Sequence, residues 1–376
     1  MRTFFIVTLI VLTIDFLISS FFFKKTDVWN NDQWQDKYYR IKSDIYHHDL
    51  MPNIEVTESW GGKLKRKIIT NSVGFRDSTQ KKINKSSNKT RILLIGDSFI
   101  EGSGYDYEYT LAGLLSSKLG NKYEILNSAV ESYSPSIYFK KIEHFISLGY
   151  KFDQALIFLD LSDIYDELFI KFDESENIIT ETPITEISLE RKIKNIAYSL
   201  GKILRDNTIT FRFLYLISDK TEILKNYIKL KIKASKFFNK SFFMTNKDDV
   251  IYYRMTHIDR GFWTFNNEKY LEVQRGIKQS EKYLKKLFKL LDENNVKSHL
   301  IIYPWPAQIQ FGDTKHAAHW KKFSKTNDIN FLDLYYIFNK TEKRETIFNN
   351  YIYGDIHWNK SGTIKIFNEI INKIEF

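Results

Sequence analysis

The chain has 376 residues, 43% of them hydrophobic, which suffices for one large folded domain with a buried core. Its 56 Lys and Arg residues against 46 Asp and Glu residues give a net charge of +10, which suits an anionic membrane surface or an acidic polymer but equally reflects composition alone. No nucleic-acid-binding signature accompanies this charge, so no nucleic-acid partner is expected. Cysteine is absent, which excludes disulfides, thiolate zinc sites and cysteine nucleophiles.

The N-terminus carries an almost unbroken apolar segment, residues 3–23, bounded by Arg2 and by Lys24 and Lys25. As a helix, such a segment spans about 30 Å of hydrocarbon. Asp15 within it costs a few kcal/mol at mid-bilayer, which the surrounding Phe, Ile and Leu residues offset. We therefore predict a single-pass transmembrane anchor. A cleavable signal peptide is the alternative, although no small-residue cleavage site follows the segment.

Residues 26–90 are polar and aromatic by turns, and we predict a lead-in and linker there that ends in a loop. From residue 91 to 376, short apolar runs alternate with segments of helical spacing. The predicted strands are 91–95, 123–127, 154–161, 298–303 and 330–334, and the predicted helices are 110–119, 137–148, 270–295 and 361–373. This alternation indicates an α/β fold of three layers, with a doubly wound parallel sheet between helices. Between about residues 168 and 270 the alternation fails, which predicts an inserted, mainly helical segment.

A Gly-Asp-Ser tripeptide at residues 96–98 directly follows the predicted strand 91–95, and Gly102 comes shortly after it. This placement puts the hydroxyl of Ser98 at the carboxyl end of a parallel strand, where active sites gather in such sheets. It also puts Ser98 at a helix start, whose backbone amides favour the negative charge that an attacked ester carbonyl develops. Ser98 is therefore a candidate nucleophile, and a helix-capping serine beside a turn is the alternative.

A second motif, Gly-Asp-Ile-His-Trp-Asn at residues 354–359, precedes the last predicted helix. A serine nucleophile needs a base, and the base needs a carboxylate to orient it. We expect His357 to accept the proton of Ser98 and Asp355 to hold the imidazole in the required tautomer. The alternative is a surface turn whose Asp caps a helix.

Together the two motifs resemble the SGNH (GDSL-like) hydrolase family, over roughly residues 70–165 and 298–373. Many members space the late block Asp-x-x-His, whereas here Gly354 stands three positions before His357. The Asp-x-His-Trp-Asn form is similar to SGNH-like proteins that acetylate exopolysaccharides, such as the alginate acetylation proteins. The Asn-Ser-Val-Gly-Phe-Arg segment at residues 71–76 often precedes the first block in membrane-linked members. The resemblance implies an SGNH-type or flavodoxin-like sheet and a catalytic domain outside the cytoplasm.

The resemblance also implies an oxyanion hole. Its donors would be the amide of Ser98, the amide of Ser132 where the family has glycine, and Ser162 where the family has asparagine. Loss of one such donor typically lowers the rate by about 10²–10³-fold. Four further side chains are expected to contact the substrate: Asp97, Asp163, Trp305 and Trp358.

These motifs predict a serine esterase or O-acyltransferase that acts, through an acyl-enzyme, on an acyl ester, foremost acetyl, of a cell-envelope carbohydrate. The alternative is a catalytically silent scaffold of the same fold that binds glycan or assembles a polysaccharide-modifying complex. No cofactor is expected, because dinucleotide and phosphate-loop fingerprints are missing. No metal is expected either: the acidic run at residues 160–167 lacks the spacing of an EF-hand, and His316 and His319 have no third ligand in sight.

Overall fold

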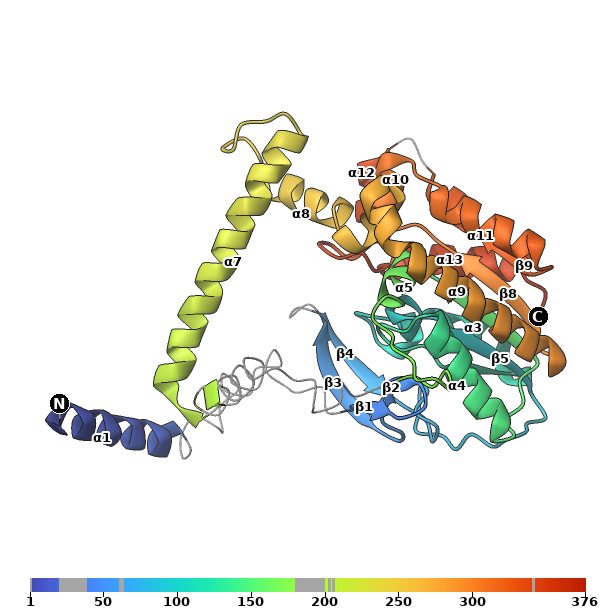
Figure 1. Ribbon diagram of the computed structural model, residues 1–376, viewed down its shortest axis with the longest axis horizontal. Helices are drawn as coiled ribbons and strands as arrows, with labels where there is room; N and C mark the ends of the chain where they lie inside the picture. The colour runs from blue at the N-terminus through green and yellow to red at the C-terminus, as the bar shows by residue number, and fades with distance from the viewer. Residues whose placement is uncertain are drawn as a thin grey trace. The chain divides into compact units, whose positions relative to one another are not determined.

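The computed structural model describes residues 2–19, 39–60, 64–179, 200, 201, 204, 207–339 and 342–376. It divides into two compact units (Figure 1). The first comprises the described parts of Met1–Lys37 and Glu181–Val250, and the second those of Tyr38–Thr180 and Ile251–Phe376. The two motifs therefore lie in the same unit.

A parallel sheet of five strands forms the centre of the second unit. Its strands are β5 (Thr90–Ile95), β6 (Tyr123–Asn127), β7 (Gln154–Leu159), β8 (Lys297–Ile302) and β9 (Asn330–Asp333). Their order in the sheet is β6-β5-β7-β8-β9, and every neighbouring pair is parallel, as in Leu93 opposite Ala155 in β5 and β7. All six residues of β7 are buried, as a strand covered on both faces requires. The predicted α/β class with a central parallel sheet is confirmed.

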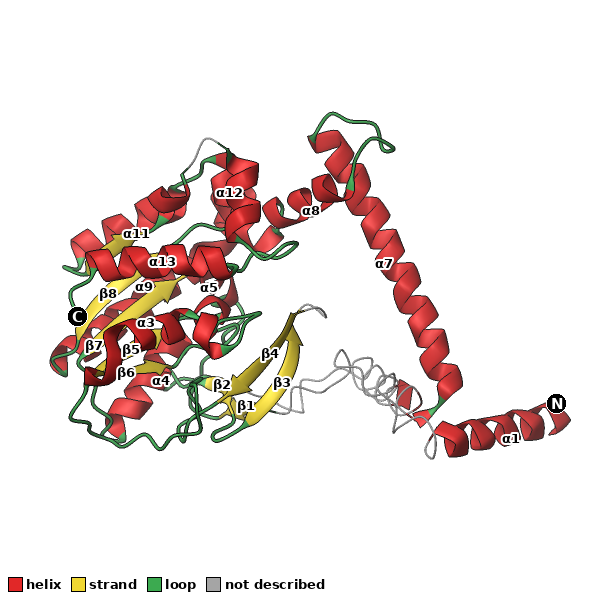
Figure 2. Cartoon of the chain, turned by 180° about the vertical axis from the view of Figure 1, so that it is seen from behind, coloured by secondary structure: helices red, strands yellow, loops and turns green. Residues whose placement is uncertain are grey.

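Helices cover both faces of this sheet. On one face α4 (Pro135–Ser147) packs against α9 (Asn267–Glu293), and on the other α3 (Leu111–Leu119) packs against α13 (Lys360–Lys373), which Figure 2 brings to the front. Each buries apolar residues at helical spacing, such as Ile366 and Ile370 of α13. Helix α11 (Lys315–Thr326) packs beside β8 and β9.

Shorter helices connect the sheet and its covering layers. Two follow strands directly: α2 (Ser98–Glu101) comes after β5 and α5 (Leu161–Asp166) after β7. The others are η3 (Tyr107–Tyr109), η4 (Gly120–Lys122), η6 (Asp259–Thr264), α10 (Pro306–Phe311), η7 (Tyr335–Phe338) and α12 (Lys343–Asn350). The carboxyl edge of the sheet therefore carries several helix starts within one region.

The predicted lead-in over residues 26–90 is not only loop. In its described part, β1 (Arg40–Ser43) pairs with β2 (His47–Leu50), and β3 (Glu55–Trp60) pairs with β4 (Leu64–Ile69), both antiparallel. The pattern of β4 alternates, with Arg66 and Ile68 buried and Lys65 and Lys67 exposed, so a charged side chain occupies an interior position. Because a charged residue takes the place of an apolar one in the alternating pattern, the apolar residues alone do not predict this strand.

The first unit contains two long helices, α1 (Arg2–Ile18) and α7 (Ile209–Phe237). Helix α8 (Lys247–Thr256) runs across the division between the units. Over the described residues, no helix combines the length and the apolar character needed to cross a membrane. Helix α1 ends at Ile18, and residues 20–23 of the expected anchor lie outside the described residues, so the structure lends the span over 3–23 no support.

Candidate active site

Ser98 stands on a tight turn between β5 and α2. The side chain of Asp97 caps this helix by accepting a hydrogen bond from the amide of Phe99 at 3.0 Å. Gly96 allows the close packing, because a Cβ there would lie 2.7 Å from Ile100. Gly102 ends the helix in the left-handed conformation, with φ of 91°. Gly96, Asp97 and Gly102 are therefore residue types that a tight strand-to-helix turn requires.

The structure brings Ser98, His357 and Asp355 into one chain of hydrogen bonds. The Oγ of Ser98 lies 2.8 Å from Nε2 of His357, and Nδ1 of His357 lies 2.5 Å from Oδ1 of Asp355. A carboxylate can only accept, so Nδ1 carries a proton and Nε2 is left to accept from the serine hydroxyl. This is the arrangement in which an imidazole serves as a general base towards a hydroxyl.

Asp355 is held as an anion. Burial by itself would raise its pKa, but the hydrogen bonds and charge of His357, together with a hydrogen bond from Trp60, outweigh burial and hold the pKa well below its usual range. The loop that carries it is itself fixed, since the amide of Ile352 donates to the carbonyl of His357 at 2.8 Å. Asn359 then caps α13 by accepting from Gly362 at 3.0 Å. The late motif is therefore a rigid turn followed by a capped helix.

Trp60 is a site residue that sequence reasoning missed. Its indole Nε1 donates to Oδ2 of Asp355 at 3.0 Å, and its ring meets that of His357 edge-on at 5.0 Å between centroids. It comes from the end of β3, 295 positions away from Asp355 in the chain. No local pattern signals a contact over that separation.

A buried ion network beneath α2 was likewise not predicted. Glu101 is fully buried and accepts from Arg40 at 2.7 and 2.9 Å and from Arg66 at 3.2 Å. Burial alone would raise the pKa of Glu101, but these two guanidinium groups lower it, and it stays ionised. Arg76 donates to the carbonyls of Glu101 and Gly102 at 2.6 and 2.7 Å. The network fixes the carboxyl end of the short helix that begins with Ser98.

The predicted oxyanion donors differ in their availability. The amide of Ser98 is the first in α2 and, within the described part of the chain, donates to no acceptor. Ser132 is exposed and has φ of 66°, a left-handed conformation that favours glycine, as the family pattern has it. No hydrogen bond joins Ser132 to Ser98 among the described residues, so its role stays a prediction.

Ser162 does not have a free donor. Its amide and its hydroxyl both donate to Oδ1 of Asp160, at 2.5 and 2.7 Å, because Asp160 caps the start of α5. Ser162 thus takes part in the cap of α5, and its role as an oxyanion donor stays a prediction that would need one of these hydrogen bonds to break.

The side chains predicted to contact substrate are buried. Trp305 is 1% exposed and its Nε1 donates to Oδ2 of Asp160 at 2.8 Å. Trp358 is 3% exposed and packs edge-on against Phe99 and Tyr303, with centroids 4.9 and 4.6 Å apart. Asp97 and Asp163 are equally enclosed. These side chains support the site from within the core, and Trp358 also lines the cavity beside His357, so their contact with substrate stays a prediction.

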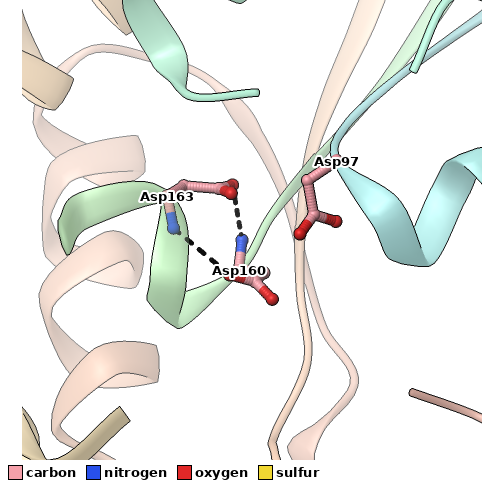
Figure 3. A group of neighbouring side chains, drawn as sticks. All are labelled: Asp97, Asp160 and Asp163. Carbon is pink, nitrogen blue, oxygen red and sulfur yellow. Dashed lines mark hydrogen bonds between the residues drawn. The ribbon is translucent and has the colours of Figure 1, made fainter. Parts of the chain in front are cut away.

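Asp97, Asp160 and Asp163 form a buried carboxylate cluster, whose oxygens include a set lying within 4.8 Å of one another (Figure 3). Burial, joined by the charge of Asp160, raises the pKa of both Asp97 and Asp163 well above the usual range. Asp163 accepts from the amide of Asp160 at 2.9 Å and from Tyr138 at 2.7 Å. These are the described residues best placed to hold a cation, but their raised pKa values indicate that bound protons relieve the repulsion.

The space beside the dyad is narrow. Ser98 and His357 are each 8% exposed. A small cavity borders His357, and its other walls include Phe99, Ser103, Tyr105 and Trp358. Aromatic rings therefore form much of the cavity wall beside the imidazole.

No protein-family model matches the chain, and no curated protein does. Among solved structures, it is similar to the psychrotrophic esterase EstA from Pseudoalteromonas sp., in a structure inhibited by monoethylphosphonate. The sequence identity is 10%, the match covers 76% of this chain and 96% of that chain, and the TM-score is 0.36.

Proposed function

We propose that this chain is a serine esterase or O-acyltransferase of the SGNH type, with Ser98 as nucleophile, His357 as general base and Asp355 as the orienting carboxylate. The observation that carries the proposal is the hydrogen-bonded series from Ser98 through His357 to Asp355, with separations of 2.8 and 2.5 Å. The location of Ser98 at the carboxyl edge of a parallel sheet supports it.

In the proposed reaction, Oγ of Ser98 attacks the ester carbonyl carbon while Nε2 of His357 takes the hydroxyl proton. The tetrahedral oxyanion receives a hydrogen bond from the amide of Ser98, and the amide of Ser132 is the candidate second donor. The carbon–oxygen bond to the alcohol then breaks, the alcohol leaves with the proton from Nε2, and an acyl ester remains on Ser98. Water or a sugar hydroxyl, deprotonated in turn by Nε2 of His357, then attacks the acyl carbon; the bond to Oγ of Ser98 breaks, and Nε2 returns the proton to Oγ.

We further propose an acetyl ester of a cell-envelope carbohydrate as the substrate, at a membrane surface outside the cytoplasm. The support is the Asp-x-His-Trp-Asn block, the net charge of +10 and the exposed apolar residues of α1. Mass spectrometry of envelope glycans should show altered acylation in cells that carry Ser98→Ala in place of the wild-type chain. Unchanged acylation would refute this substrate.

The second candidate function is a silent scaffold that binds glycan or assembles a polysaccharide-modifying complex. The commitment of both Ser162 donors to Asp160 favours it, because the oxyanion hole then has one donor fewer. The two functions differ in whether Ser98 can be acylated.

The deciding experiment treats the full chain with a fluorophosphonate and with p-nitrophenyl acetate. We expect labelling at Ser98, mapped by peptide mass spectrometry, and ester hydrolysis that Ser98→Ala and His357→Ala both abolish. Ser87→Ala is a matched control, since Ser87 is an exposed loop serine. A folded wild-type chain that is neither labelled nor active would exclude the enzyme and favour the scaffold.

A further inference from the structure

Helix α7 of the first unit exposes a cluster of apolar residues on one side, bordered along the helix by Lys220 and Lys231. Ile223 and Leu224 are 59% and 57% exposed, and Tyr227 and Ile228, one turn later, are 36% and 39% exposed. Residues at this spacing lie together on one side of a helix. Large apolar side chains gathered in this way on a surface mark a site of interaction.

The opposite side of the same stretch is basic. Lys225, Lys229, Lys233 and Lys236 recur at intervals of four, four and three residues, and all are exposed. Over its whole length α7 has six lysines and one arginine against one aspartate and one glutamate. A helix with an apolar side and a lysine-rich side has the pattern of helices that lie in the boundary between lipid headgroups and acyl chains.

Helix α1, in the same unit, has the same apolar character. Ile6, Val7, Ile10 and Val11 are each about half exposed, between 50% and 53%. The acidic residue of this helix, Asp15, does not face solvent: it accepts from the amides of Ile209 and Thr210 at 2.7 and 3.0 Å, at the start of α7. Its charge is thereby placed against the positive end of α7. The two helices are joined at the point where α1 is least apolar.

We propose that α7 is a lipid-binding element, which lies on an anionic bilayer surface with Leu224 and Ile228 inserted and its lysine row against the headgroups. The complementarity of the lysine row to anionic lipid selects a bilayer as the occupant. The proposal concerns α7 alone, and it is independent of the acyl chemistry proposed for Ser98.

The test uses the absence of cysteine from the chain. Leu224→Cys and Lys229→Cys each introduce a single thiol, on the apolar and basic sides of α7, for labelling of the full chain with an environment-sensitive fluorophore. In the presence of phosphatidylcholine vesicles containing phosphatidylglycerol, the probe at 224 should shift to the blue and be quenched by spin-labelled lipid, while the probe at 229 should not.

A charge-reversal series separates α7 from α1. Lys229→Glu with Lys233→Glu should reduce the fraction of the probe at 224 that inserts by about tenfold or more, since each lysine near an anionic surface contributes on that scale. The matched control is Lys118→Glu with Lys122→Glu, the same charge change at exposed positions of the second unit.

Three results would overturn the proposal: probes at 224 and 229 that both stay in water with vesicles, insertion that is indifferent to both charge reversals, and a blue shift at 224 that needs no lipid and grows with protein concentration. The last would assign the apolar side to a second copy of the chain. Fluorophosphonate labelling of the same samples reports on the active site separately, so failure of either proposal is distinguishable from failure of the other.

Discussion

The indole of Trp60 and the carboxylate of Asp355 are joined by a hydrogen bond of 3.0 Å, although the two residues come from opposite ends of the second unit's sequence. Asp355 thus has partners on both oxygens, since Oδ1 receives the imidazole Nδ1 and Oδ2 the indole. Trp60 is in this sense a positioning residue for His357, acting through Asp355.

Trp60→Phe keeps the ring edge near His357 and removes the donor. A hydrogen bond to a charged group contributes about 1.5–3 kcal/mol, so the rate of fluorophosphonate labelling of Ser98 should fall by roughly 10- to 100-fold. A variant that is labelled at the wild-type rate would remove Trp60 from the site.

Glu101→Gln removes the buried carboxylate that Arg40 and Arg66 share, and leaves Arg66 with Glu58 and Arg40 with Glu131. Breaking such a pair from one side typically costs about 3–5 kcal/mol, so urea unfolding of the second unit should shift by that amount. Lys118→Ala is the control, because an exposed surface change there should stay within about 0.5 kcal/mol. Equal midpoints for the two variants would contradict the importance of the network beneath α2.

The same substitution, Asp to Asn, should destabilise the protein much more at Asp160 than at Asp163. Asp160 accepts from Ser162 twice, from Asp163 and from Trp305, so Asp160→Asn should cost about 2–4 kcal/mol at neutral pH. Burial and the charge of Asp160 raise the pKa of Asp163 well above its usual range and favour its neutral form, so Asp163→Asn should cost less than Asp160→Asn, about 1 kcal/mol or less.

The pH dependence of that pair gives a further check. A folded pKa above the unfolded value means that the stability contributed by Asp163 is complete below the unfolded pKa and is lost as pH rises through the folded pKa. Asp163→Asn should therefore gain stability relative to wild type as the pH of the unfolding experiment rises above the unfolded pKa of 3.8. If instead it loses ground as pH rises, Asp163 is an anion in the folded chain.

His316 sets part of the acid sensitivity. Burial, with a smaller effect of His319, lowers its pKa to about 3, below the unfolded value of 6.5. The unfolded chain then takes up the proton first, so stability is complete above about pH 6.5 and falls by about 1.4 kcal/mol per pH unit towards pH 3. His316→Gln should flatten this fall when unfolding is followed from pH 6.5 to 4. An unchanged slope would show that His316 is protonated in the folded state.

The structural features that could be predicted are those determined by residues close to one another in the sequence. The strands around Leu93 and Leu156 can be predicted from their runs of apolar residues, because a buried parallel strand needs apolar residues on both faces. The two motifs could be read because turn glycines and helix caps lie within a few residues of Ser98 and His357.

The features that could not be predicted depend on contacts between residues far apart in the sequence. Arg66 looks like one more surface cation in a lysine-rich segment until Glu101, 35 positions on, is seen to meet it in the core. Trp305 and Trp358 lie in segments that resemble functional motifs, yet both side chains are buried. Large aromatic rings contribute most of their stabilisation when they are enclosed. Burial of a given side chain depends on partners that no short window of sequence contains.

Ser98 and His357 are 259 positions apart in the sequence, and the strands β6, β7, β8 and β9 lie between them. A ribosome therefore completes the nucleophile long before it completes the base. On the proposed function, an unfinished chain, or one clipped by a protease before residue 355, holds a serine that nothing can activate. On this layout, acyl transfer requires that the sequence from Ser98 to His357 be present and folded in one chain.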